Sequence, residues 1–488
     1  MSFLDKQFLY FLPVAIALWY GARGYYGLRV ALLTAASLVF YGYRHWWMIL
    51  VVLAYALVDW AAGRGLATRR RPWVLALGVG FNLALLCLWK YTPLALGTLT
   101  QLIGWPWPDL DLALQDRWVA PLGVSFYAFA GIAYMVDVYR GVVKAEPSPL
   151  RYALFTSFFP HLLAGPILRA REFLVHLGPA EVPQMPCAMG EGLFLIGRGY
   201  FKKAALGDGI AAAIDPFLAH VGDATTVGVW SLPYLYLYAL QIYFDFSGYT
   251  DIARGLGLLF GFRWPENFDW PYLATSVRVF WRRWHMTLSR FLRDYLYVPL
   301  GGNRRGPGRT ALNVMITMLL GGIWHGASWS FMLWGGLHGV FLVANFAWGR
   351  TALHRRLDQL TGLWRTGWRL LRILLTFNAV CLAWAFFRLT DLADGLACLR
   401  KAFLFDPAEA LAGGSGDPAP WFLLTTYGLA AAAAVTAARG KPLPEGLALA
   451  RGAPFMRGLV WGASLGLFAL GILLAPGSRS APFIYFQF

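Results

Sequence analysis

Long apolar segments, separated by short polar or basic ones, follow one another along almost the whole chain. Many of them are long enough to cross the hydrocarbon core of a bilayer, which takes about 20 residues as a helix. Segments 152–168 and 190–217 are short or polar for full spans, so we expect them to be re-entrant or broken. The pattern predicts spans at 7–21, 27–43, 47–63, 73–98, 118–138, 152–168, 190–217, 228–246, two between 311 and 348, 370–388, 422–438 and 458–475.

The composition supports a membrane protein. Hydrophobic residues make up 58% of the chain, charged residues 14%, and the mean hydropathy is +0.52, whereas roughly a quarter of the residues in soluble domains are charged. We expect an all-α, polytopic protein with roughly 11–13 transmembrane or re-entrant helices. Because no soluble domain or internal repeat is visible, residues 1–488 are predicted to form one integral-membrane domain. Phe8–Trp19 is followed by no small-residue cleavage site, which favours an uncleaved first helix.

The formal charge of +17 raises the question of a nucleic-acid partner. The basic residues lie in short loops between apolar segments, as the positive-inside bias of membrane proteins produces. We therefore expect a multi-pass membrane protein surrounded by lipid, with no nucleic-acid partner. The basic blocks at 64–71, 278–309 and 350–372 are predicted to be cytoplasmic.

One histidine lies inside an uncharged segment. Residues 311–348 contain no Asp, Glu, Lys or Arg, and His325 lies within them. These 38 residues suffice for two crossings that return the chain to the same side. His325 would then lie roughly 20 Å along the first helix, near mid-membrane or beyond. An ionisable side chain in such a place is a candidate functional group.

A neutral imidazole at this position could take a proton from a hydroxyl that attacks a carbonyl, which is general-base chemistry. Small residues after His325 would let a substrate or another backbone approach it closely. The alternative is a histidine satisfied by a backbone carbonyl in helix packing. His338, thirteen residues further on, is more often structural than catalytic when taken alone.

The segment before this run is strongly basic. Residues 276–309 hold eight arginines and a single acid, Asp294. If 276–297 is one helix, Arg278, Arg282, His285 and Ser289 share a face. Such a helix at the membrane surface could meet the phosphates of an anionic donor such as a nucleotide-bearing thioester. Its arginines could equally meet lipid headgroups.

Other chemistries find little support. The three histidines at 285, 325 and 338 have neither metal-ligand spacing nor a carboxylate companion, so no metal site is expected. There is no G-x-S-x-G elbow, and the four cysteines form no disulfide or metal pattern. Asp137, Asp245 and Asp251 could relay protons in a transporter, or could pair with Arg140 or Arg254 or accept from hydroxyls.

Several motifs together resemble the membrane-bound O-acyltransferase family, and within it the bacterial alginate O-acetyltransferase branch. The resemblance covers much of 115–340, the predicted family core, and 350–470 matches in hydropathy alone. The matching stretches are PLGVSFYAFAGIAYMVDVYRG (121–141), FFPHLLAGPILR (158–169), GYFKKAALGD (199–208), QIYFDFSGYTDIARGLGLLFGFRWPENFDWPY (241–272), FWRRWHMTLSRFLRDYLYVPLGGNRRG (280–306), GGIWHGASWSFMLWGGLHG (321–339) and the terminal FIYFQF.

The resemblance implies an acyltransferase of the bacterial inner membrane, whose helices enclose a central funnel or tunnel. It implies that His325 is the essential catalytic histidine and His285 its partner. Candidates for contacts with the substrate or acyl donor are Arg282, Trp324, Ser328 and Asn303. It implies no bound cofactor, with acetyl-CoA as the donor substrate. A periplasmic or membrane-anchored acetyltransferase would be the protein partner, and an exopolysaccharide such as alginate would be modified.

Two alternatives stay open at this point. Related enzymes move D-alanyl or other acyl groups onto cell-envelope polymers, so the acyl group and the acceptor could differ. A transporter or exporter without chemistry of its own would make Asp137 and Asp245 central and His325 dispensable.

Overall fold

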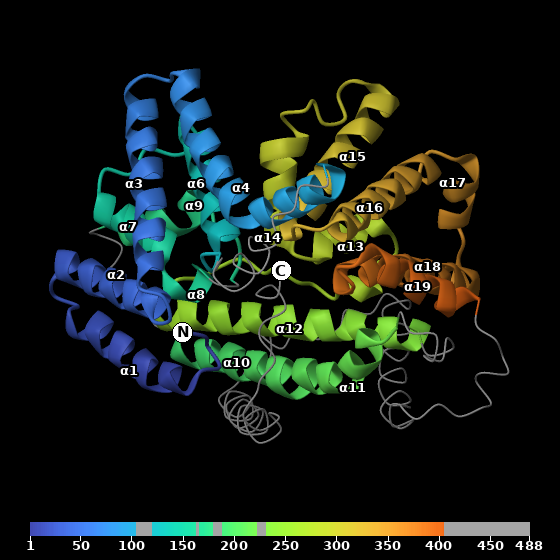
Figure 1. Cartoon of the computed structure of the whole chain (residues 1–488), viewed down its shortest axis with the longest axis horizontal. Helices are drawn as coiled ribbons and strands as arrows, with labels where there is room; N and C mark the ends of the chain where they lie inside the picture. Colours follow the sequence, from blue (N-terminus) through green and yellow to red (C-terminus); the bar gives the residue numbers. More distant parts are fainter. Residues whose placement is uncertain (104–119, 163–164, 179–187, 222–230, 405–488) are drawn as a thin grey trace. The chain divides into compact units, whose positions relative to one another are not determined.

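The structure, a computed structural model, describes residues 1–103, 120–162, 165–178, 188–221 and 231–404 (Figure 1). These residues form helices and connecting turns, and no strand occurs among them, which confirms the all-α prediction. The spans predicted at 422–438 and 458–475 lie outside the described residues. The chain divides into two units: unit 1 comprises 1–199 and 249–265, and unit 2 comprises 200–248 and 266–488.

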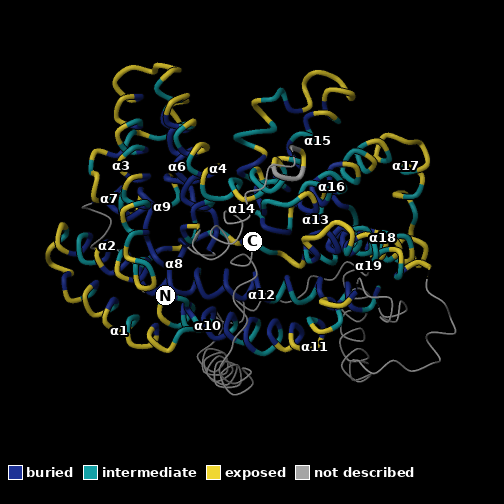
Figure 2. Tube along the Cα trace, in the orientation of Figure 1, coloured by how far each residue is buried: buried dark blue, intermediate teal, exposed yellow. Residues whose placement is uncertain are grey.

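Unit 1 contains the N-terminal helices, of which α3, α4 and α6 pack side by side (Figure 1). Helix α6 is almost entirely buried (Figure 2). It begins at Val124 rather than at the predicted 118, because the preceding Gly123 takes a left-handed φ of 73°. The helices are α1 (Lys6–Gly21), α2 (Tyr26–Gly42), α3 (Trp47–Thr68), α4 (Pro72–Ile103), α6 (Val124–Tyr139), α7 (Pro149–Ser157), α8 (Phe159–Leu162), α9 (Ala170–Phe173), η1 (Leu174–Leu177), α10 (Met189–Tyr200) and the last part of α12 (Ser231–Leu259).

Unit 2 contains the basic segment and the uncharged segment of the sequence. Helix α16 packs against α13, α15 and α18. The α15–α16 pair is the predicted hairpin, with only residues 326–328 between its helices. The helices are η3 (Phe201–Gly207), α11 (Asp208–Ala219), the first part of α12, η5 (Pro271–Leu273), α13 (Val277–Arg283), α14 (Met286–Leu292), η6 (Arg293–Tyr297), α15 (Gly306–His325), α16 (Trp329–Trp348), α17 (Ala352–Asp358), α18 (Gly362–Arg388) and α19 (Leu392–Phe403).

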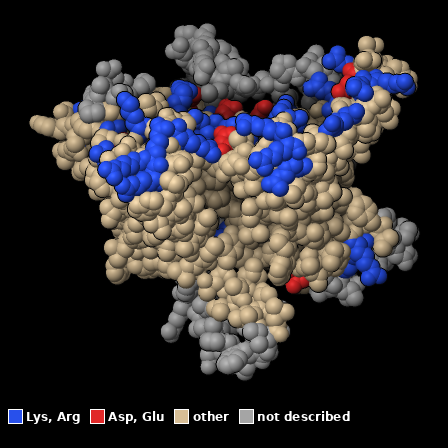
Figure 3. Space-filling model, turned by 90° about the horizontal axis from the view of Figure 1, so that it is seen from above, with Lys and Arg blue, Asp and Glu red and all other residues tan. Residues whose placement is uncertain are grey.

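Among the described residues, four helices are long and apolar enough to cross a membrane: 47–68, 72–99, 329–348 and 362–388. In the most apolar 18-residue stretch of helix 72–99, only 17% of the residues are buried. Most of its apolar side chains therefore face outward, as lipid contact requires. Figure 3 shows lysine and arginine side chains gathered mainly near one edge of the surface, next to large areas with few charged side chains. These features agree with a protein that crosses the membrane several times.

The two segments that looked too short or polar for full spans differ in the structure. Segment 152–168 is broken, because the separate helices α7 and α8 meet at Phe158, which confirms the prediction there. Segment 190–217 instead changes from α-helix to the π-helix η3 at Phe201 and back to α-helix at Asp208 without leaving the helical conformation. The prediction of a broken helix is therefore wrong for 190–217.

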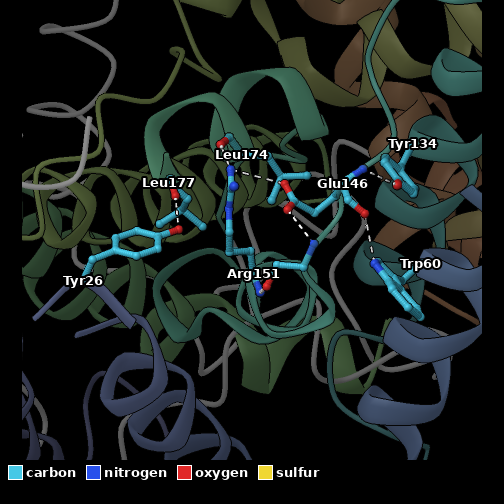
Figure 4. Close-up of polar contacts among 8 residues, drawn as sticks. Tyr26, Trp60, Tyr134, Glu146, Arg151, Leu174 and Leu177 are labelled. Atoms are coloured by element: carbon cyan, nitrogen blue, oxygen red, sulfur yellow. Dashed lines mark hydrogen bonds and ion pairs between the residues drawn. The ribbon is translucent and has the colours of Figure 1, made fainter. Parts of the chain in front are cut away.

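The loop between α6 and α7 is held by Glu146, which is 5% exposed (Figure 4). Its backbone N–H donates to the Tyr134 hydroxyl at 3.0 Å, and its backbone oxygen accepts from the Trp60 indole at 3.0 Å. Its carboxylate lies 3.3 Å from Arg151, which also donates to the Leu174 carbonyl. Burial raises the pKa of Glu146, while the Ser148 N–H and Arg151 oppose that change.

Buried carboxylates in both units are paired with cations. In unit 1, Asp251 forms a bidentate pair with Arg198. In unit 2, Lys203 is 1% exposed and lies 2.6 Å from Asp208 and 2.7 Å from Asp245. The sequence analysis had suggested neighbouring Arg140 or Arg254 as partners of the intramembrane aspartates. It did not predict the pairs with Arg198 and Lys203.

Candidate functional site

His325 is the last residue of α15, at the point where the uncharged hairpin turns. The two helices cross at glycines. A Cβ atom on Gly322 would lie 2.3 Å from the Phe331 carbonyl oxygen, and one on Gly335 would lie 2.3 Å from the Met318 carbonyl oxygen. Ser328 starts α16 by accepting from the N–H groups of Ser330 and Phe331. The close crossing and this N-cap together set where His325 lies.

Aromatic rings enclose the His325 imidazole, which is 3% exposed. The ring centroids of Trp324 and Trp334 each lie 4.9 Å from that of His325, and the Phe387 centroid lies 5.2 Å away. Gly326 leaves room for a further ring, because a Cβ atom there would lie 2.1 Å from Phe331. Little water can reach such a pocket, and a neutral imidazole there would meet a reacting hydroxyl in a low-dielectric environment.

His338 lies in the same aromatic cluster, about one helical turn after Trp334 on α16. Trp334 lies 4.9 Å from it, the same centroid distance that separates Trp334 from His325. The Trp281 indole N–H donates to its Nδ1 at 3.3 Å. A ring fixed by this hydrogen bond and fully buried fits the structural role that the sequence suggested.

His285 is also fully buried, with a left-handed φ of 41° between α13 and α14. The single helix expected over 276–297 is therefore wrong: α13 ends at Arg283 and α14 begins at Met286. Hydrogen bonds to Asn267 compete with helical continuation, because this asparagine binds His285 Nδ1 at 3.2 Å and its backbone oxygen binds the Met286 N–H. His285 and Arg282 consequently do not share a face.

Trp324 contacts both candidate histidines. Its ring centroid is 6.3 Å from that of His285 and 4.9 Å from that of His325. Arg282 and Asn303 are exposed, and the Ser328 hydroxyl caps α16. The structure thus brings His285, Trp324 and His325 into one buried cluster and leaves Arg282 and Asn303 at the surface.

Comparison with known proteins identifies the family. The family model for the membrane-bound O-acyltransferase (MBOAT) family matches residues 138–390, which is more than half of the chain. The chain belongs to the membrane-bound O-acyltransferase family. It is therefore an O-acyltransferase and a multi-pass protein of the bacterial inner membrane, and the transporter alternative is set aside.

Curated relatives of this acyltransferase cover most of its length. The probable alginate O-acetylase AlgI of Pseudomonas aeruginosa is 38% identical, over 83% of this chain and 75% of its own. The protein of the same name from Pseudomonas putida is 34% identical over 100% of both chains. The peptidoglycan O-acetyltransferase of Helicobacter pylori is 35% identical, over 68% of this chain and 64% of its own.

The sequence did not point to several residues of the candidate site. Trp334 and Phe387 complete the enclosure of His325, and Asn267 holds His285. Nothing in the local sequence relates Phe387 to His325, because α18 follows the hairpin by many residues. Asn267 lies in the PENF stretch that carried the family resemblance, but no spacing rule connected it to His285. Among the described residues, no group of three or more potential metal ligands occurs.

Proposed function

We propose that this O-acyltransferase takes an acetyl group from acetyl-CoA at the cytoplasmic face and passes it across the inner membrane for O-acetylation of an exopolysaccharide such as alginate. The observation that carries this proposal is the similarity to proteins named alginate O-acetylase, at 34–38% identity over most of the chain. A periplasmic or membrane-anchored acetyltransferase would then complete the modification of the polymer.

His325 is the catalytic base in this proposal. Its imidazole takes the proton of an acceptor hydroxyl while the hydroxyl oxygen attacks the acetyl carbonyl carbon. A C–O bond forms, the C–S bond breaks, and the electron pair leaves with the CoA thiolate. A thiol pKa near 8.5 makes this a good leaving group without a strong general acid. The burial of His325 among three aromatic rings supports the role, because it shields the reaction from competing water.

The donor would approach from the basic side of the site. Arg282, Arg304 and Arg305 are exposed, and exposed guanidinium groups can bind the phosphates of a nucleotide-bearing thioester. Either polarising backbone amides or His285 would stabilise the oxyanion that develops on the carbonyl. A central tunnel that leads donor and acceptor to His325 is part of this proposal.

The test is acetyl-CoA turnover by purified full-length protein in detergent or nanodiscs, with an acetylatable acceptor. We expect His325→Ala to lose at least about 10²-fold in kcat, the lower range for removing a general base. His176→Ala is the matched control, because His176 is exposed in η1 of unit 1, and it should retain parental turnover. Full activity of His325→Ala would reject the catalytic assignment, and no turnover by the parent would reject acetyl-CoA as donor.

Peptidoglycan is the second candidate for the final acceptor, because a relative at 35% identity is named peptidoglycan O-acetyltransferase. Supplying alginate oligosaccharides and peptidoglycan glycan strands side by side, with the partner acetyltransferase present, separates the two. Acetyl transfer to glycan strands alone would move the proposal to peptidoglycan.

A further inference from the structure

Asn267 holds His285 with both its backbone and its side chain. Its backbone oxygen accepts from the Met286 N–H at 3.0 Å, and two residues later the Asp269 N–H donates to the Arg283 carbonyl at 3.0 Å. Residues 267–269 therefore run beside 283–286 and are hydrogen-bonded to them on either side of His285. A left-handed φ of 41° is uncommon for a residue other than glycine, and these bonds hold the chain in it.

The side-chain oxygen of Asn267 can be identified from its neighbours. The Thr287 backbone N–H lies 3.1 Å from Oδ1, and the Thr287 hydroxyl lies 2.9 Å from it. A backbone N–H only donates, so the atom that faces it must be the amide oxygen and not the amide nitrogen. The orientation of the amide is fixed by the fold itself.

The same oxygen determines which His285 nitrogen carries the proton. His285 Nδ1 lies 3.2 Å from Oδ1. An amide oxygen has no proton to donate, so Nδ1 must be the donor. In a neutral imidazole the lone pair then resides on Nε2.

We propose that Asn267 is a positioning residue that locks His285 in the Nδ1–H tautomer, so that the neutral His285 acts through Nε2 only as a hydrogen-bond acceptor and not as a donor to the developing oxyanion. This inference rests on the proposed function, in which a hydroxyl attacks an acetyl thioester near His325. It also decides which of two groups, backbone amides or His285, stabilises the developing oxyanion. A nitrogen with a lone pair cannot stabilise an oxyanion, so that task falls to backbone amides.

The surroundings of His285 keep the imidazole neutral. Phe246 of α12 packs edge-on at 4.7 Å between ring centroids, and Trp324 of α15 lies 6.3 Å away. The charged groups on the adjoining segments, Arg283 and Asp269, lie 3.7 Å from each other. Burial lowers the pKa of His285 to about 3, so Nε2 stays unprotonated across the working pH range.

Asn267→Asp is the decisive variant. The Asn267 Nδ2 atom is buried and has no hydrogen-bond partner among the described residues, so a carboxylate keeps the three bonds to Oδ1 and loses none. The new charge 3.2 Å from Nδ1 stabilises the imidazolium and raises the pKa of His285. The titration of His285, followed by ¹⁵N NMR of the labelled protein, should therefore move to higher pH by at least about one unit. A role for Asn267 that does not involve its contact with Nδ1 would leave that titration unmoved.

Asn267→Leu tests the loss of the acceptor oxygen. Without that oxygen nothing at this position selects the Nδ1–H tautomer, so we expect the ¹⁵N spectrum of His285 to show the Nε2–H tautomer as well. Asn82→Asp is the matched control, because Asn82 is a fully buried asparagine of α4 in unit 1. It should lower thermal stability without changing the tautomer or the titration of His285.

Histidine-labelled ¹⁵N NMR of the full-length protein, with His285→Gln used for assignment, reads the tautomer directly. A protonated Nδ1 supports the inference, and a protonated Nε2 overturns it, as does an unchanged titration of His285 in Asn267→Asp. The NMR measurement requires no turnover. If acetyl-CoA proves not to be the donor, the proposed function fails while the tautomer still decides this inference.

Discussion

The crossing of α15 and α16 predicts a large functional effect of a single methyl group. In Gly322→Ala the new Cβ atom would lie 2.3 Å from the Phe331 carbonyl oxygen, where an ordinary contact begins at 3.4 Å. The helices must therefore separate by about 1 Å. Gly322 lies three residues before His325, so the imidazole moves with the helix. A misplacement of this size can reduce the rate about 10²-fold, and we expect that loss in kcat/KM.

The assay is acetyl transfer by the purified variant, read beside its thermal unfolding. Gly336→Ala is the matched control, because its Cβ atom would meet only Leu319 Cδ2 at an ordinary 3.5 Å. That variant should keep parental activity and gain up to about 1 kcal/mol from the better helix propensity of alanine. If Gly322→Ala were as active as Gly336→Ala, the crossing would not position His325 and this reasoning would be wrong.

Three further predictions concern stability. Lys203→Met leaves two buried carboxylates without their cation and should cost about 3–5 kcal/mol in unfolding free energy. Its control is Arg263→Met, in a pair whose arginine side chain is 56% exposed, which should cost at most about 1 kcal/mol. Equal unfolding midpoints for the two variants would contradict this prediction. His285→Gln should make the stability of the protein less sensitive to acid. Below its ordinary pKa of 6.5 the imidazole is protonated in the unfolded chain, whereas in the folded protein it is not protonated until about pH 3. Parallel curves of stability against pH for parent and variant would contradict this prediction. Ser328→Ala should lower the free energy of unfolding by about 1 kcal/mol through the lost N-cap, and Ser328→Asp should recover most of that loss. A raised KM for the acyl donor in Ser328→Asp would instead favour the predicted donor contact.

The parts of the fold that follow from hydrophobic pattern and charge were predicted well. The uncharged run 311–348 forms the expected helical hairpin, because its length and lack of charge leave few other arrangements. The break in 152–168 was also predicted, because polar residues reduce the free energy gained by burying a continuous helix in lipid. The candidate site was chosen because an ionisable residue, His325, lies in a segment that should exclude it, and its catalytic role stays a prediction.

The failures concern interactions that a one-dimensional pattern does not contain. Helical periodicity placed His285 on a face with Arg282. The helix ends there instead, because residues 267–269, about 18 residues earlier, form two backbone hydrogen bonds and one side-chain hydrogen bond with 283–286. Lys203 was not connected to Asp245, because their pairing requires α12 to pack beside η3. Arg282 and Asn303 lie at the surface, and their contacts with an acyl donor stay predictions.

The π-helix η3 lets the chain carry one extra residue without separating a buried ion pair. Its wide turn is closed by a hydrogen bond from the Asp208 N–H to the Lys203 carbonyl, five residues back. Residues five apart thereby lie above one another, which brings the Lys203 ammonium onto the Asp208 carboxylate. In an α-helix, residues five apart lie about 140° from each other around the axis, whereas residues four apart share a face. Changing η3 to an α-helix at unchanged length would therefore separate the pair, and removing one residue between Lys203 and Asp208 as well would bring it together again.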